Sequence, residues 1–152
     1  MQAQVTTFLL QEILATIRAT GAPFDPATTY VGLYTAVANN QLATTMANIT
    51  EATYTGYARK LSSPFSGPFI DASGNVFFQG GLEKFTGPSD GTGQNIQGIF
   101  IANALTDGDL LYFLDFQSLV SLLLPTDALD FVMIFQLSAA AQWDASIVSP
   151  AV

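Results

Sequence analysis

The last third of the sequence contains three apolar segments that are typical of β-strands, and they constrain the fold more than any other feature. They cover Ile96–Asn103, Asp109–Phe116 and Ala128–Ser138. The first two are separated by Thr106, Asp107 and Gly108, and an Asp-Gly pair favours a tight hairpin turn. In the third segment every second residue is large and apolar, as in a core-facing strand: Leu129, Phe131, Met133, Phe135 and Leu137.

These strands are apolar on both of their faces. Val132 and Ile134 lie on the face opposite to the alternating residues of the third segment. In the second segment Leu110, Tyr112, Leu114 and Phe116 are expected on one side, and Leu111 and Phe113 on the other. Because a strand with a solvated face alternates apolar and polar residues, we expect cover on both faces of this sheet.

Earlier segments add shorter strands. Aromatic and β-branched residues predict strands over Thr29–Ala36 and Thr53–Leu61, and short ones over Asn75–Gln79 and Leu82–Phe85. Ser62–Pro68 is expected to be a connection or an interrupted edge strand, and Gly87–Gly93 a loop. The sequence therefore predicts one mainly β domain over residues 1–152, an antiparallel β-sandwich or barrel of about seven to eight strands spanning 28–138.

The N-terminal segment predicts an α-helix over residues 5–20. Its apolar residues follow the 3.6-residue period at Val5, Phe8, Leu9, Ile13 and Ile17. We expect the helix to cover a face or edge of the β domain, with docking on a neighbouring chain as the alternative. Residues 139–152 are expected to form a C-terminal arm that orders on a partner.

Composition narrows the function. The sequence has no histidine and no cysteine. Nucleophiles activated by histidine and ordinary zinc or copper sites are therefore excluded, and we expect no enzymatic activity, no metal and no cofactor.

Charge and the length of the apolar stretches argue against two kinds of partner, nucleic acids and membranes. The net charge is −8, and the cations are Arg18, Arg59, Lys60 and Lys84 alone. Nucleic-acid binding depends on neutralising phosphates with a cluster of such residues, so no nucleic-acid partner is expected. No apolar stretch approaches the roughly 20 residues that span a bilayer, so no membrane association is expected either.

Charged residues make up 11% of the chain, which indicates that part of its surface is covered by other proteins. The segment from Leu119 to Leu124 is the first candidate for such a contact. It is either a buried crossover or short strand, or an apolar finger that inserts into a neighbouring subunit. The candidate interface residues are Leu119, Val120, Leu122, Leu123 and Leu124, together with Trp143, Ile147 and Val148 of the C-terminal arm.

Other polar motifs favour structural roles. Glu51 and Arg59 bracket the start of an expected strand and are predicted to form a structural ion pair. Asp107 and Asp109, with Asp115 further on, resemble part of a Ca²⁺ loop, but their spacing does not match its pattern. Acids near turns and strand ends could in principle serve a carboxylate-dependent hydrolase, and the candidates are Asp107, Asp109, Asp115, Asp127 and Asp130. Such acids are more often simply solvated.

Four short motifs in this order resemble small virion proteins of tailed bacteriophages. They are YVGLYTA at Tyr30–Ala36, Glu51 followed by GYARK at Gly56–Lys60, GIFIAN at Gly98–Asn103, and GDLLYF at Gly108–Phe113. That group contains head-decoration (cement) and tail-fibre-like minor structural proteins. The resemblance implies that Tyr57, Arg59 and the Gly108 turn maintain the fold.

The resemblance implies a non-catalytic component of the virion, assembled in the host cytoplasm. The leading hypothesis is a capsid decoration protein, a homotrimer that binds between subunits of the major capsid protein. A tail, baseplate or fibre-attachment subunit, in contact with other virion proteins, is the alternative. A second alternative is a carbohydrate-binding module that stacks sugars on Trp143 and exposed tyrosines.

Overall fold

The computed structural model describes residues 3–5, 29–38, 44–137 and 143–148. Residues 6–20 of the predicted N-terminal helix lie outside these ranges, and Val5 ends a short strand, β1. Within the described residues, no helix is long and apolar enough to cross a membrane.

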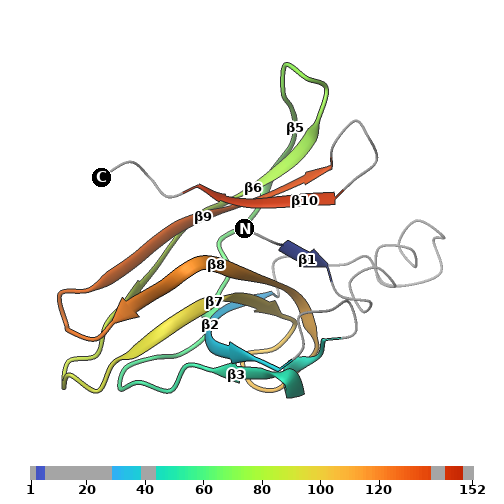
Figure 1. Ribbon diagram of the computed structural model, residues 1–152. Helices are drawn as coiled ribbons and strands as arrows, with labels where there is room; N and C mark the ends of the chain where they lie inside the picture. Colours follow the sequence, from blue (N-terminus) through green and yellow to red (C-terminus); the bar gives the residue numbers. More distant parts are fainter. Residues whose placement is uncertain (1–2, 6–28, 39–43, 138–142, 149–152) are drawn as a thin grey trace.

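The described strands form two antiparallel sheets (Figure 1). The first sheet has the order β1-β8-β7-β2-β3, with β4 also paired to β2. Its strands are β1 (Ala3–Val5), β8 (Leu110–Leu122), β7 (Gln94–Ala102), β2 (Tyr30–Val37), β3 (Ile49–Glu51) and β4 (Lys60–Leu61). The second sheet has the order β10-β9-β6-β5, with β10 (Trp143–Val148), β9 (Ala128–Leu137), β6 (Val76–Thr86) and β5 (Ser66–Ile70). A 3₁₀ turn, Met46–Asn48, precedes β3. The mainly β, antiparallel prediction is confirmed, and the choice between a sandwich and a barrel stays a prediction.

The main core brings the inner faces of both sheets together. Leu33, Ile99 and Leu114 of the first sheet share one apolar cluster with Phe85 and Phe131 of the second. A second cluster, which includes Tyr34, Phe100 and Phe113, is also fully buried. The first sheet is therefore covered on both faces along β7 and β8, as the sequence predicted.

A bulge in β8 changes which of its residues share a face. Ile101 pairs with Tyr112, whereas the next residue of β7 pairs with Leu110, so Leu111 is an extra residue. Leu110 consequently belongs to the same cluster as Phe113, and Leu111 to the same cluster as Tyr112. The predicted faces were wrong here because strict alternation fails at a bulge.

The predicted strand Thr53–Leu61 is also wrong. Tyr57 N–H donates to the carbonyl oxygen of Tyr54 (2.9 Å), and Gly56 between them has a φ of +89°. This turn interrupts the extended backbone, and only Lys60–Leu61 pairs as β4. Residues 49–51, for which no strand was predicted, form β3.

Two other strands are longer than predicted. The expected strands Asn75–Gln79 and Leu82–Phe85 are one strand, β6, with a register shift between Gln79 and Leu82. The two glycines between them accommodate a bulge without ending the strand. In β8, pairing resumes beyond Phe116 after a second irregularity and continues to Leu122.

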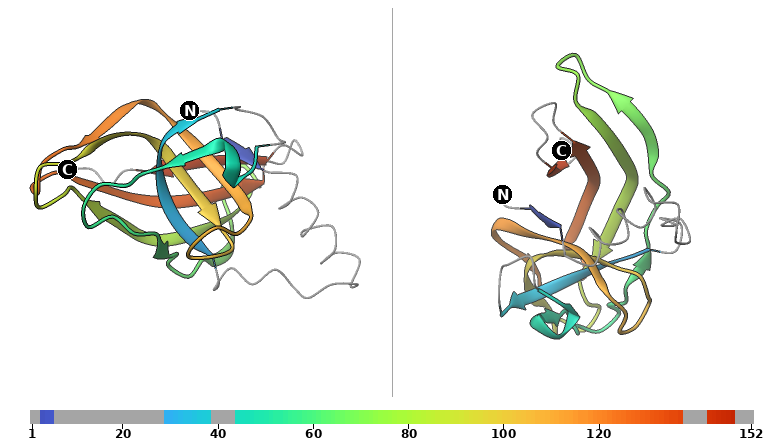
Figure 2. Two further views of the ribbon diagram at one scale, coloured as in Figure 1. Left: turned by 90° about the horizontal axis from the view of Figure 1, so that it is seen from below. Right: turned by 90° about the vertical axis from the view of Figure 1, so that its right-hand side faces the viewer.

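The two sheets separate toward one end of the molecule. Figures 1 and 2 show the hairpin of β5 and β6 projecting past the first sheet. Within the second sheet, β9 stays paired with β6 as far as Val76. We call residues 66–79 of this hairpin the arm.

Candidate interaction surfaces

Two glycines from the resemblance motifs make room for the side chains of Tyr34 and Tyr57. A Cβ added at Gly32 would overlap the Phe100 ring and lie 2.8 Å from Tyr57 Oη. A Cβ added at Gly98 would overlap a backbone carbonyl and lie 2.5 Å from Tyr34 Oη. These motifs therefore position aromatic side chains in the fold.

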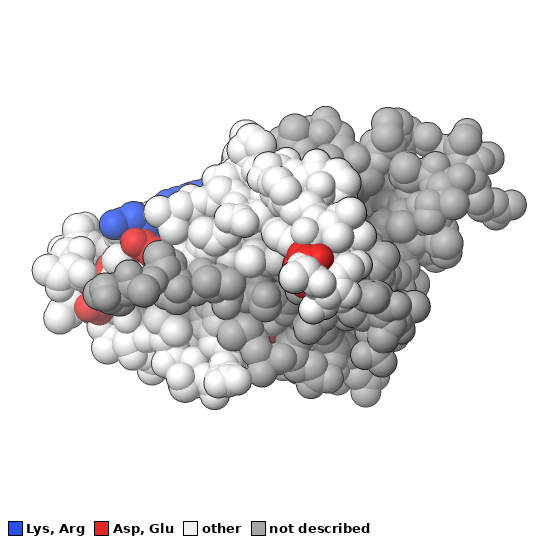
Figure 3. Space-filling view, turned by 90° about the horizontal axis from the view of Figure 1, so that it is seen from above, with Lys and Arg blue, Asp and Glu red and all other residues white. Residues whose placement is uncertain are grey.

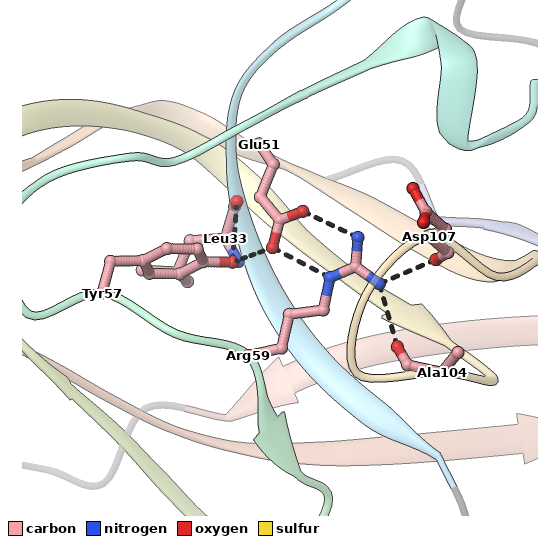
Figure 4. Close-up of polar contacts among 6 residues, drawn as sticks. All are labelled: Leu33, Glu51, Tyr57, Arg59, Ala104 and Asp107. Carbon is pink, nitrogen blue, oxygen red and sulfur yellow. Dashed lines mark hydrogen bonds and ion pairs between the residues drawn. The ribbon is translucent and has the colours of Figure 1, made fainter.

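Glu51, Tyr57 and Arg59 form a network against β2 (Figure 4). Arg59 donates from Nε to Glu51 Oε1 (2.9 Å) and from Nη2 to Glu51 Oε2 (2.7 Å), the two-pronged geometry that the guanidinium group favours. Tyr57 Oη donates to Glu51 Oε1 (2.8 Å) and accepts from Leu33 N–H (3.0 Å). Glu51 and Arg59, predicted from the sequence to be a structural ion pair, are thus in contact, and the network joins the loop after β3 to strand β2.

The same arginine fixes the connection between β7 and β8. Its Nη1 donates to the carbonyl oxygens of Ala104 (2.9 Å) and Asp107 (2.8 Å), and its guanidinium lies 5.1 Å from the centre of the Phe100 ring. The turn uses positive φ angles at Asp107 (51°) and Gly108 (75°). The connection spans seven residues, 103–109, and is longer than the tight turn that the Asp-Gly pair predicts.

Electrostatics keep this network intact. The Arg59 side chain is 5% exposed, and its hydrogen bonds to Glu51 raise its pKa above the ordinary value. Burial raises the pKa of the Tyr57 hydroxyl, so it is a neutral donor at physiological pH. The cluster is built to hold the backbone in place.

The acidic residues named in the sequence analysis are dispersed. Asp115 accepts from Tyr34 Oη (2.5 Å) at a strand irregularity, and Asp127 accepts from Leu123 N–H (2.8 Å) in the turn before β9. Asp109 pairs with the side chain of Asn103 across the β7–β8 connection, and Asp130 lies 3.8 Å from Lys84. Each carboxylate of these four stabilises a turn, a strand or a neighbouring side chain.

The segment Leu119–Leu124 ends β8 and begins the turn to β9. Leu122 is fully buried, and Val120 packs against the main core. Leu119, Leu123 and Leu124 are 60%, 42% and 56% exposed. The segment is thus a paired strand end with three exposed leucines, and insertion into a neighbouring subunit stays a prediction.

Trp143, Ile147 and Val148 lie in β10, which pairs along its whole length with β9 of the same chain. Trp143 is opposite Leu137, and Val148 is opposite Val132. The environment of these three side chains lies outside what the structure describes. The part of the predicted C-terminal arm that is described is therefore a strand of the second sheet.

The arm formed by residues 66–79 presents a further set of apolar side chains, which were not among the interface residues predicted from the sequence. Phe69, Ile70 and Phe78 are 43%, 74% and 43% exposed, and Leu82 at its base is 55% exposed. A signal was present, because Asp71 is the only charged residue between Leu61 and Leu82. The described surface thus has two separate apolar areas, one on the arm and one at the β8–β9 turn.

Comparison with known proteins gives one match. The family model described as Podophage GP4 fiber I protein gp80 matches residues 4–133 of this chain. No curated protein matches the sequence significantly. The family match covers most of the chain, including the arm, the Glu51–Arg59 network and the four motifs. It supports a fibre-like structural protein of the virion and favours the tail or fibre alternative over capsid decoration.

Proposed function

Because this chain belongs to the family of the podophage GP4 fiber I protein gp80, we propose that it is a non-catalytic subunit of a phage tail fibre or of its attachment to the tail. The match over residues 4–133 is the observation that carries this proposal. The capsid decoration hypothesis has no comparable support.

The surface of the molecule agrees with such a role. Large apolar side chains of the arm and of the β8–β9 turn are roughly half exposed, on a chain with few charges. Exposed apolar areas of this kind mark contacts with other proteins. In a fibre subunit they would be covered by neighbouring copies or by other virion proteins.

The polar cluster of Glu51, Tyr57 and Arg59 supports a structural role over catalysis. Arg59, Glu51 and Tyr57 use their polar atoms on one another and on backbone groups. A general acid or base has to offer such an atom to a substrate. We propose that the partners are other copies, as a homotrimer, and other virion proteins, with assembly in the host cytoplasm and without nucleic acid or membrane contacts.

Copy number in purified phage particles tests the proposal. Quantitative mass spectrometry with isotope-labelled peptides would give the ratio of this chain to the major capsid protein. A fibre or attachment subunit is expected at a small percentage of the capsid protein. A near-equimolar ratio, or a simple fraction of it, would place the chain on the capsid lattice and overturn the proposal.

Localisation on particles supplies an independent readout. Gold-labelled antibodies against this chain are expected to mark the tail end of intact virions and to leave the head unlabelled. Labelling spread over the head would contradict the fibre assignment. Absence of the chain from particles would contradict every virion role.

A further inference from the structure

The arm is apolar on both of its faces. Phe69 is opposite Phe77, with ring centres 5.4 Å apart, and both lie on one face. Ile70 is opposite Val76 on the other face, which Phe78 shares because it is two residues further along β6. A hairpin with this pattern needs cover on both sides, yet it projects past the first sheet (Figure 2).

The exposed area is substantial for so small a segment. A phenylalanine side chain buries about 150–250 Å² when it is covered, so exposure of 43% leaves about 90 Å² on each of Phe69 and Phe78. Ile70 is 74% exposed. Ile70 and Phe78, together with the half-buried Val76, therefore give one face of the arm an exposed apolar area of the kind that marks interaction sites.

The distribution of charge favours a second copy of this chain as the partner that covers the arm. The chain carries a net charge of −8, so two copies repel each other unless their contact lies where acids are sparse. On the arm the single acid, Asp71, is held in the hairpin turn, where its carboxylate accepts from the N–H groups of Ser73 (2.8 Å) and Asn75 (2.9 Å). In Figure 3, which looks down on the arm, the described surface there is uncharged apart from one small acidic spot, and the cations lie at a separate edge.

Side chains, and not the backbone edge, provide the contact. β5 is the edge strand of the second sheet among the described residues, but Pro68 has no N–H to donate. A register shift between Ser66 and Phe69 interrupts the strand further. Such edges are poor templates for adding a strand, so a partner meets the apolar faces instead.

We propose that copies of this chain associate through the arm, each arm packing on the arm of a neighbouring copy with Ile70 and Phe78 at the centre of the contact. An apolar, charge-poor surface is complementary to itself, because no like charges meet across the contact. The inference does not depend on where the protein lies in a particle.

Sedimentation of the purified full chain tests the inference. The wild type is expected to form an oligomer, and Ile70→Asp to weaken its association by about a hundredfold, since it places a charge in each copy at the centre of the contact. Leu105→Asp is the matched control. Leu105 is 52% exposed in the β7–β8 connection, outside the arm, and its substitution is expected to leave association unchanged. Far-UV circular dichroism checks that both variants are folded.

Mixing experiments determine what the arm contacts. Ile70→Lys alone is expected to dissociate like Ile70→Asp, and an equimolar mixture of the two is expected to associate again, because opposite charges then meet across arms. Failure of the mixture to associate would show that the arm contacts a different surface and would overturn arm-to-arm packing.

Two further outcomes would overturn the proposal. One is a wild type that stays monomeric at high micromolar concentration. The other is an Ile70→Asp variant with wild-type mass. If the wild type is monomeric and Ile70→Asp is lost from particles, the occupant is another virion protein. Copy number in particles is measured separately, so failure here would contradict the proposed homotrimer and leave the proposed place in the tail fibre standing.

Discussion

Replacing Arg59 by alanine tests the reasoning about the buried network most directly. The substitution removes both bonds to Glu51 and both bonds to the carbonyl oxygens of the β7–β8 connection. Removing one partner of a buried ion pair costs about 3–5 kcal/mol, because the other charge stays in a poorly solvated place. Glu51 is 27% exposed and keeps its bond from Tyr57, so we expect the lower end, about 3 kcal/mol.

The measurement is the free energy of unfolding from urea titration, followed by far-UV circular dichroism. A loss of about 3 kcal/mol corresponds to a fall in Tm of about 6–12 °C for a chain of this size. The matched control is Lys84→Ala. Lys84 lies 3.8 Å from Asp130, with side-chain exposures of 58% and 36%, so its removal is expected to cost less than about 0.5 kcal/mol.

A double-mutant cycle with Glu51→Ala separates the ion pair from the loop contacts. If the pair carries the effect, adding Glu51→Ala to Arg59→Ala costs little more, since the stranded carboxylate is then gone. Additive effects of the two substitutions would refute the ion-pair reasoning. An Arg59→Ala variant as stable as Lys84→Ala would refute the importance of the whole network.

Three further outcomes are expected. Gly98→Ala should lower stability by about 3 kcal/mol in urea titration, because its Cβ would overlap the carbonyl oxygen of Leu114, which is fixed in β8; a loss under about 1 kcal/mol would contradict this. Burial raises the pKa of the fully buried Tyr34 above 10.0, so the unfolded chain loses this proton at a lower pH than the folded chain. The free energy of unfolding should therefore fall above pH 10 by about 1.4 kcal/mol per pH unit for each such tyrosine, and Tyr34→Phe should remove the contribution of Tyr34 to this fall. The Thr92 hydroxyl lowers the pKa of Asp90 to about 2, so Thr92→Ala should move it back toward 3.8 in an NMR titration of the carboxyl carbon, and an unchanged value would show that the hydroxyl has no such effect.

Strand prediction succeeded where local pattern and burial agree. The alternating residues of β9 predict their own inner face, and Phe131 and Met133 are buried in the main core as expected. It failed where one residue changes the register. Leu111 and Gly56 act through backbone geometry, a bulge and a turn with positive φ, and a count of apolar residues does not detect either.

The structural ion pair could be predicted from the sequence, but its contacts with the β7–β8 connection could not. Glu51 and Arg59 are eight residues apart, so their pairing follows from local charge. That Arg59 also holds Ala104 and Asp107 depends on the pairing of β2 with β7, which brings residues 45 and 48 positions away within reach.

The sequence by itself determined the class of the molecule. The absence of histidine and cysteine, the shortage of cations and the apolar strands of the last third point to a β-rich, acidic chain. These are sums over the whole chain, and no arrangement in space changes them. Only the tertiary structure decided which apolar residues are free to make contacts. Leu122 and Leu123 are neighbours in the sequence, yet the first is buried and the second exposed, and Ile70 is exposed because the sheets separate before they reach it. Exposure depends on which strand lies opposite, and that pairing is set by register across the chain.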